Sequence, residues 1–312
     1  MTPSYLGRLL LLSSACFFLV QFVVGGLLAL FAPAAVRRAG TMPPQAGARF
    51  LLTLRLLPAG LAALSVAILC VPSYLRFEPR IAEEEVGFVC LAAAILGASL
   101  CASAILRTFR ALLRSWRYVR ECGGLQASVA GEPVWIVRQN AGFALAGILR
   151  PRLLISRTAM RELSPGQLAV ALRHERAHQA SRDNLKRLLI LLAPSLFPLR
   201  LIEQAWVKCS EWAADDQAAA GDAEQSAALA EALVRIARLQ AGIAMPPLVA
   251  SLVEADEDLS LRVDRLLESP IYPSTLHAGA MALCAVMLLI ISIALSPASL
   301  RIVHQLLERL LD

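Results

Sequence analysis

Apolar residues of this 312-residue chain gather in four long blocks rather than being spread evenly along it. The blocks cover residues 9–31, 50–75, 86–106 and 276–295. Each block reaches the ~20 residues that a helix needs to cross the hydrocarbon layer of a bilayer. The pattern therefore predicts a mainly α membrane protein with about four transmembrane helices, three of them in residues 1–122 and one in residues 273–312.

The composition also favours a membrane protein, because 57% of the residues are hydrophobic, above the ~45–50% usual for soluble domains. The first block could instead be a cleaved signal peptide, since the small residues 32–35 follow it. The block is, however, longer than the apolar region of a signal peptide, and only Arg8 precedes it. A retained helix is therefore the favoured prediction.

Arginines beside the blocks give the predicted orientation, because loops rich in arginine stay in the cytoplasm. They follow the first and third blocks as Arg37, Arg38, Arg49, Arg107, Arg110, Arg114, Arg117 and Arg120. In a bacterial-type inner membrane we expect both termini to be extracytoplasmic and residues 123–272 to be cytoplasmic. The tail at residues 300–311 has apolar residues at helical spacing and is expected to lie on the bilayer surface. Arg55, in the second block, is expected to snorkel to the interface.

Residues 123–272 are long enough for one α+β domain with its own core. Ser164, Pro165 and Gln167 form a helix-start signal in which Ser164 caps the helix and Gln167 closes a capping box. We predict a helix from Pro165 to about Leu192. The other expected elements are strands at 134–137, 143–149 and 153–156, helices at about 202–220 and 224–240, a loop at 241–247, and a segment at 261–267 that leads back to the membrane.

The pentapeptide of residues 174–178 carries the chemistry of this domain. His174 and His178 are four residues apart, so a helix places both imidazoles on one face, where they can share a zinc ion. Glu175 lies beside them as a candidate general base. The competing interpretation is a pair of polar helix residues that bind a carboxylate without any metal.

A second helix should complete this site. Glu211 and Asp215 are four residues apart and so share a face. Glu211 can supply a third, anionic zinc ligand, and Asp215 can accept a hydrogen bond from the second ring nitrogen of a ligating histidine. Three protein ligands leave one position of a single zinc ion open for water, as in catalytic sites. Asp183 points to the far side of a regular helix and is predicted to be structural.

A fifth apolar stretch at residues 188–199 tests this reading. It is too short to span a membrane and contains Pro194 and Pro198. A single crossing there would put Glu211 and His174 on opposite sides of the membrane. The stretch is therefore a core or re-entrant segment, or the metal site does not exist.

Cysteines and charge exclude other classes of function. The seven cysteines are scattered without a CxxC pair, so they indicate neither a disulfide framework nor a sulfur-rich metal site. The net charge is +6, and the arginines cluster beside the apolar blocks rather than among aromatic residues of a separate domain. This placement favours contact with anionic lipid headgroups over binding to nucleic acid.

The segments 174–178, 181–184 and 211–215 together resemble the membrane zinc metallopeptidases of the BlaR/MecR type, the staphylococcal β-lactam sensor-transducers. The resemblance implies a zincin-like (gluzincin) domain in which His174, His178 and Glu211 bind zinc and Glu175 is the base. Those sensors end in a large penicillin-binding domain, whereas about fifteen residues follow Pro297 here. We therefore expect no β-lactam sensing of that kind.

The expected activity is that of a zinc endopeptidase acting on a cytoplasmic or membrane-proximal protein. The resemblance suggests regulatory signalling and a transcriptional repressor as substrate, and an oligomer is compatible with it. Arg182 is the candidate for stabilising the oxyanion. Two alternatives remain: a membrane quality-control protease of the HtpX or prenyl-protein type, and a non-catalytic signalling or scaffold protein braced by zinc.

Overall fold

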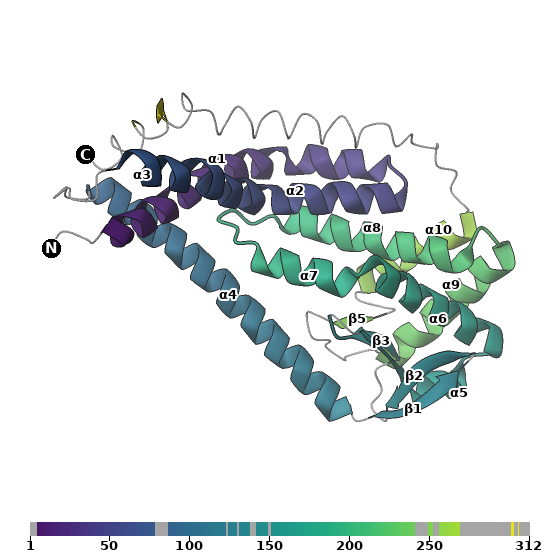
Figure 1. Cartoon of the computed structure of the whole chain (residues 1–312). Helices are drawn as coiled ribbons and strands as arrows, with labels where there is room; N and C mark the ends of the chain where they lie inside the picture. The colour runs from purple at the N-terminus through teal and green to yellow at the C-terminus, as the bar shows by residue number, and fades with distance from the viewer. Residues whose placement is uncertain are drawn as a thin grey trace.

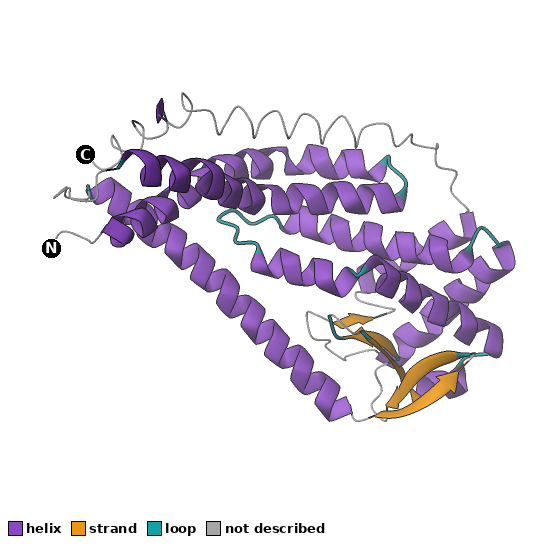
Figure 2. Ribbon diagram, in the orientation of Figure 1, coloured by secondary structure: helices purple, strands orange, loops and turns teal. Residues whose placement is uncertain are grey.

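Three long, apolar helices dominate the first part of the molecule (Figures 1 and 2). The computed structural model describes residues 5–78, 87–122, 124–129, 131–137, 142–148, 151–240, 249–251, 256–268, 301–302 and 305. The helices of this part are α1 (Tyr5–Gly40), α2 (Pro44–Ser65), the π-helical η1 (Val66–Cys70), α3 (Val71–Phe77) and α4 (Phe88–Cys122).

The helical segments Tyr5–Gly40, Pro44–Phe77 and Phe88–Glu121 are long and apolar enough to cross a membrane. The prediction of a mainly α chain with long apolar helices in residues 1–122 is therefore confirmed. The fourth predicted span at 276–295 and most of the tail at 300–311 lie outside the described residues.

The helices α1 and α4 cross at very close range. Gly97 of α4 makes this possible, since an added Cβ there would lie 2.2 Å from the carbonyl oxygen of Ser14 in α1. Small residues at such crossings allow two membrane helices to pack backbone against backbone. Past this crossing α4 diverges from α1 and α2 and runs on to the sheet (Figure 1).

A five-stranded sheet follows α4 in the order β1-β2-β4-β3-β5, with only β2 and β4 parallel. Its strands are β1 (Gly124–Val129), β2 (Glu132–Val137), β3 (Phe143–Ala146), β4 (Arg152–Ser156) and β5 (Val249–Ser251). The three β-like runs of the sequence are β2, β3 and β4. The strands β1 and β5 were not anticipated, because each depends on pairing with a strand already present rather than on a strong pattern of its own.

The remaining helices are α5 (Arg157–Glu162), α6 (Pro165–Ser181), α7 (Asp183–Leu192), α8 (Arg200–Ala219), α9 (Ala223–Gln240) and α10 (Asp256–Glu268). Of these, α6 packs against the sheet, and α8 packs between α6 and α2. Phe143 and Ile155 of the sheet pack with Leu172 of α6, Leu233 of α9 and Leu266 of α10 in one buried apolar core. The core fixes α6, which carries the pentapeptide, against the sheet.

The predicted start of α6 is confirmed, and its predicted end is wrong. Ser164 accepts from the backbone N–H of Gln167 and the Gln167 side chain accepts from Ser164, so the capping box is formed. The expected helix to Leu192 is broken at Arg182, whose φ of 55° and ψ of 42° are left-handed. The chain changes direction there, and α7 begins at Asp183.

The stretch at 188–199 turns back within the molecule, so α7 and α8 form a hairpin that packs beside α1 and α2 (Figure 1). Gln21, in the middle of the first apolar block, donates to the carbonyl oxygen of Pro194 at 3.1 Å. Phe197 packs against Gly25, where an added Cβ would lie 3.3 Å from its ring. This arrangement matches the core or re-entrant alternative, and His174 and Glu211 lie together rather than on opposite sides.

Arg55 does not snorkel to an interface, contrary to the prediction. Arg55 is only 5% exposed, and its Nε lies 2.5 Å from Oε1 of Glu203 in α8. Its guanidinium also donates to the carbonyl oxygens of Ile190 and Ala193, at 3.1 Å and 3.4 Å. The prediction assumed a lipid-facing side chain, whereas the hairpin covers this position and supplies polar partners.

Candidate metal centre

The helix α6 buries the three polar residues of the pentapeptide on one face. His174, Glu175 and His178 are each 0% exposed. The face opposes α8, where Glu211 is 4% exposed and Asp215 is 0% exposed. Burying this many ionisable groups is costly unless they bind one another or a metal ion.

Three candidate ligand residues form a small triangle. The two Nε2 atoms of His174 and His178 are 3.1 Å apart. Glu211 places one oxygen 3.5 Å from His174 Nε2 and the other 3.4 Å from His178 Nε2. A tetrahedral zinc ion with bonds of 2.0–2.1 Å separates its ligand atoms by about 3.3 Å. The spacing of this group therefore suits a zinc ion, and the residues His174, His178 and Glu211 could hold one.

The protons of the two rings point away from this triangle. Nδ1 of His174 lies 2.9 Å from Oδ1 of Asp215, and Nδ1 of His178 lies 2.7 Å from Oδ2 of Asp183. Ionised carboxylates only accept hydrogen bonds, so each Nδ1 carries the proton in a neutral ring. In that neutral tautomer both Nε2 atoms keep a lone pair free for a metal ion.

Asp183 belongs to the site, although it was predicted from the sequence to be structural. The left-handed turn at Arg182 swings Asp183 back toward α6, where a continuous helix would have turned it away. Ser210 of α8 donates to Oδ2 of Asp183 at 2.9 Å, and Lys186 donates to Oδ1 at 2.6 Å. A signal existed: Asp and Asn at 183–184 are poor in helix interiors and favoured at helix starts.

Arg262 of α10 is a second residue that the sequence interpretation missed. It donates to both oxygens of Asp215, at 2.9 Å and 2.7 Å, and its Nη1 lies 3.1 Å from Oε2 of Glu211. The segment 261–267, expected to lead back to the membrane, lies in α10, which packs on the domain. Residues 269–300, which follow it, lie outside the described residues. Arg262 therefore holds two of the acidic side chains in place.

The charges of the centre do not balance by themselves. Among the side chains that the structure describes, the carboxylates of Glu175, Glu211, Asp215 and Asp183 meet the cations Arg262 and Lys186. Although burial opposes it, Asp215 and Glu211 raise the pKa of His174, and Glu211 and Asp183 raise the pKa of His178 well above its ordinary value. The acidic surroundings therefore favour positive charge at the two rings, which either a proton or a bound cation can supply.

The pKa values of the acidic residues reflect these contacts. Burial alone would raise the pKa of Asp215, but Arg262 and His174 outweigh it and bring the value to about 2. Burial would likewise raise the pKa of Glu211, and the charges of His178 and Arg262 hold it well below its ordinary value. Both side chains are therefore anionic at neutral pH, as ligands and hydrogen-bond acceptors need to be.

Glu175 differs from the other acids. Neither of its carboxylate oxygens has a hydrogen-bond partner among the residues that the structure describes. Burial raises the pKa of Glu175 to about 7, against the opposing effect of His174 and His178. A buried carboxyl group with a pKa near neutrality can both accept and return a proton, which is the property of a general base.

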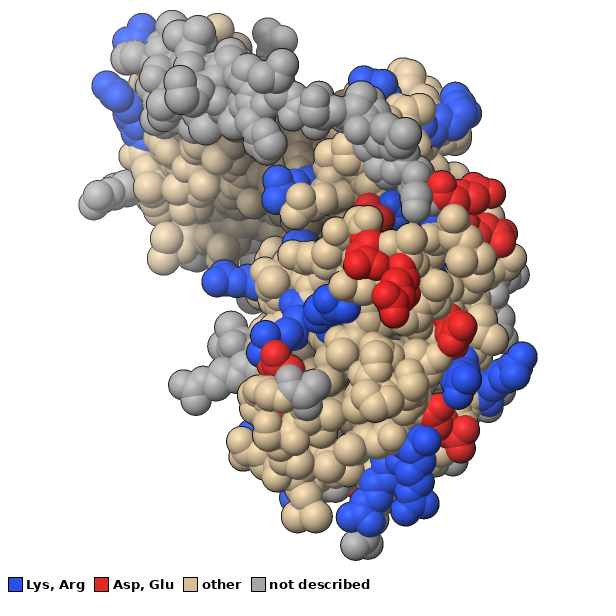
Figure 3. Space-filling model, turned by 90° about the vertical axis from the view of Figure 1, so that its right-hand side faces the viewer, with Lys and Arg blue, Asp and Glu red and all other residues tan. Residues whose placement is uncertain are grey.

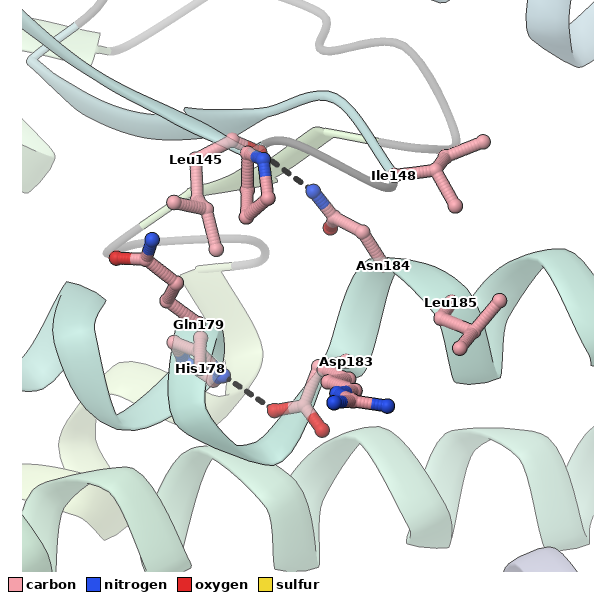
Figure 4. A pocket seen from close by; sticks show the side chains of 9 residues that line it. Leu145, Ile148, His178, Gln179, Asp183, Asn184 and Leu185 are labelled. Atoms are coloured by element: carbon pink, nitrogen blue, oxygen red, sulfur yellow. Dashed lines mark hydrogen bonds and ion pairs between the residues drawn. The ribbon is translucent and has the colours of Figure 1, made fainter.

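A cleft of about 390 Å³ opens beside His178, between the β3–β4 connection and the junction of α6 with α7 (Figure 4). Asn184 donates to the carbonyl oxygens of Leu145 and Gly147, at 2.9 Å and 2.8 Å, and so ties α7 to the end of β3. Arg182 lines the cleft and is exposed. The candidate for oxyanion stabilisation thus lies in the same cleft as one candidate ligand.

The sheet edge next to this cleft is occupied. An extended substrate can pair with a free sheet edge, but β3 pairs with β4 on one side and with β5 on the other. The strand β5 runs antiparallel to β3, with Leu145 opposite Ala250. A peptide could therefore reach β3 only by displacing β5.

Figure 3 shows the side of the molecule that lies at the right in Figure 1. Charged side chains of both signs are spread over this face. One ion pair of the domain joins Arg176 on α6 to Glu132 on β2. Such a mixed face has no extended single-sign field of the kind that steers polyanions.

No protein-family model matches the chain, and no curated protein matches it. The geometry of the centre therefore has to carry any functional conclusion.

Proposed function

We propose that this chain is an integral-membrane, zinc-dependent endopeptidase with one zinc ion per chain. The observation that carries the proposal is the buried triangle of His174, His178 and Glu211, whose spacing suits a zinc ion and whose acidic surroundings favour a cation. Glu175 lies next to it without a partner among the described residues. Three protein ligands beside an open cleft are typical of catalytic rather than structural zinc sites.

Each residue has a distinct role in the proposed reaction. Bound zinc would supply a Lewis acid that polarises the scissile carbonyl and lowers the pKa of water. Glu175 accepts a proton from the attacking water and returns it to the leaving amine. Asp183 and Asp215 hold the two imidazoles in the tautomer that leaves Nε2 free for the metal. Arg182 is the proposed partner of the oxyanion.

The resemblance of the motifs to the BlaR/MecR-type membrane metallopeptidases supports the same assignment and suggests regulatory cleavage of a protein such as a transcriptional repressor. The arginines after α1 and along α4 support a cytoplasmic position for residues 123–272 in a bacterial-type inner membrane. A reporter fused after Gly124 tests this orientation. A signal from the extracytoplasmic side would refute it.

The substitution Glu175→Gln tests the catalytic role. The full chain in lipid nanodiscs should lose cleavage of an unfolded casein by about 10²–10⁴-fold, because the proton acceptor is removed. The zinc content, measured by mass spectrometry, should stay at one per chain. The control Glu224→Gln changes an exposed glutamate of α9 and should leave both quantities unaltered.

Two results separate the alternatives. Unchanged cleavage in Glu175→Gln would refute this catalytic role. Zinc binding by a wild-type chain that cleaves no polypeptide would instead favour a signalling or scaffold protein braced by zinc.

A further inference from the structure

An apolar groove runs along the bundle, between α2 and α4, with α1 as its floor. One part has a volume of about 630 Å³ and the adjoining part about 550 Å³. Phe17, Ala63 and Cys101 line both parts, so the two are continuous. Ser13 and Ser14 are the only polar side chains among the residues that line it, and no charged side chain does. An occupant of the groove is therefore apolar.

The groove ends at the hairpin that carries the metal centre. Leu189, Leu192 and Pro194 close its second part. Leu189 and Leu192 are 40% and 46% exposed, and Leu185, four residues earlier on the same face of α7, lines the cleft beside His178. One exposed apolar stripe of α7 thus joins the membrane groove to the cleft.

A matching stripe on α4 continues in the same direction. Ile105 lines the groove and is 60% exposed. Phe109 and Leu112 follow at helical spacing and are 55% and 37% exposed. The two stripes form an apolar path out of the groove, which a bound polypeptide could follow.

The side chains that line the groove are small where a bound helix would contact them. Gly60, Ala63 and Ala67 share one face of the second helix, opposite Gly97 and Ala98 of α4. A Cβ added at Gly60 would meet no atom within 4 Å among the residues that the structure describes, so their packing does not require glycine there. Small residues on a face that no described residue fills let a further helix approach closely.

We propose that this groove binds the single membrane-spanning helix of a protein substrate. The proposal rests on the proposed peptidase function and names its substrate class: polypeptides anchored in the membrane next to the bond that is cut. From Leu192 back to Leu185, α7 rises by about 10 Å. That distance corresponds to about three residues of extended chain. The cleaved bond therefore lies within a few residues of the cytoplasmic end of the anchor.

The charge around the path adds a condition on the segment between anchor and cleavage site. Arg107 and Arg110 of α4 are exposed near it, and Arg182 lines the cleft. The only carboxylate in α7 is the buried Asp183, and the only one in α4 is Glu121, at its far end. The connecting segment should therefore be neutral or acidic.

Three synthetic probes test the proposal with the full chain in nanodiscs. The first joins a Leu/Ala helix of about 20 residues to an unstructured tail of about 30 residues. The second is the tail alone, and the third is the tail with a palmitoyl chain. Anchoring raises the local concentration, so the first probe should be cut about 100-fold faster than the tail alone, at bonds close to its helix.

Variants separate the groove from membrane attachment in general. The substitution Gly60→Phe fills the groove. It should reduce the ratio between the cleavage rates of the helix-anchored probe and the free tail by about tenfold. The control Ala102→Phe places the same ring on an exposed position of α4 outside the groove and should leave the ratio unchanged.

Photocrosslinking gives a readout that does not depend on cleavage. A photoleucine in the probe helix, with the Glu175→Gln chain, should label Gly60, Ala63 or Cys101. Labelling confined to other faces, equal cleavage of free and anchored tails, or a preference for the palmitoyl probe would each overturn the proposal. Labelling of the groove without any cleavage would refute the peptidase function and leave the docking site standing.

Discussion

The two ends of the α7–α8 hairpin bury polar groups in contrasting ways. At the end near Pro194, a few donors from other helices satisfy backbone carbonyls, and Arg55 meets Glu203, so charge is balanced. At the end near Asp183, several carboxylates meet too few cations. The difference teaches where a cation is favoured, because only the second end gathers more carboxylates than arginines and lysines around two histidines.

Among the substitutions that test this contrast, removal of Arg262 should change the free energy of unfolding most. Arg262→Met leaves Asp215 and Glu211 buried without their cation and should lower the free energy of unfolding of the metal-free chain by about 3–5 kcal/mol. Zinc should reduce the loss, because it supplies positive charge at the same place. Denaturant unfolding with and without zinc measures both effects.

The control for this experiment is Arg265→Met. Arg265 pairs with Asp216, whose side chain is 43% exposed, so the expected loss is under about 1 kcal/mol. Equal losses for the two arginines would show that burial of the carboxylates does not govern the effect.

Asp183→Asn should have the next largest effect, confined to the metal end. The amide orients His178 less strongly than the carboxylate does, so zinc should bind about 10–100-fold more weakly. Competition with a chromophoric chelator measures the affinity. Asp216→Asn is the matched control on α8, and an affinity that falls equally in both variants would contradict a specific role for Asp183.

Arg55→Met examines the other end of the hairpin. The carbonyl oxygens of Ile190 and Ala193 would lose their donor, at a cost of about 1–3 kcal/mol. Hydrogen exchange should become faster in the last turn of α7 while zinc affinity changes little. The exposed Arg49 provides the control Arg49→Met, which should leave this exchange rate as it is.

Gln21→Leu should have the smallest effect. Its single hydrogen bond to Pro194 lies among apolar helices, where such bonds contribute about 0.6 kcal/mol on average. A small shift of the thermal midpoint in detergent is expected. A loss as large as that of Arg55→Met would show that the hairpin tip depends on this bond more than on the Arg55 contacts.

The sequence predicted the features that depend on residues close together along the chain. The spacing of His174 and His178 and the capping box at Ser164 are local, and the structure forms the helix that they indicate. The long apolar helices follow from composition alone. The contact of Asp215 with His174 also forms, as the spacing of these residues on their two helices predicted.

The parts that were not predicted depend on the path of the chain. Asp183 reaches His178 only because a non-glycine residue, Arg182, adopts a left-handed conformation. Asp183 and Asn184 signal a helix start, but they do not indicate the direction in which the chain turns. Arg262 reaches Asp215 from 47 positions away, after α10 folds back on the domain. Arg55 was mistaken for a lipid-facing residue because the hairpin that covers it is itself too short to look like a membrane helix.

The facing imidazole nitrogens, 3.1 Å apart, have a consequence for the life of the protein in a cell. If a metal ion binds at this buried group, it binds the folded chain and not the unfolded one, so it would act as a folding ligand. Zinc at 100 times its dissociation constant would then stabilise the fold by about 2.7 kcal/mol. The amount of folded protein would follow the supply of metal, and scarcity would lower it through degradation.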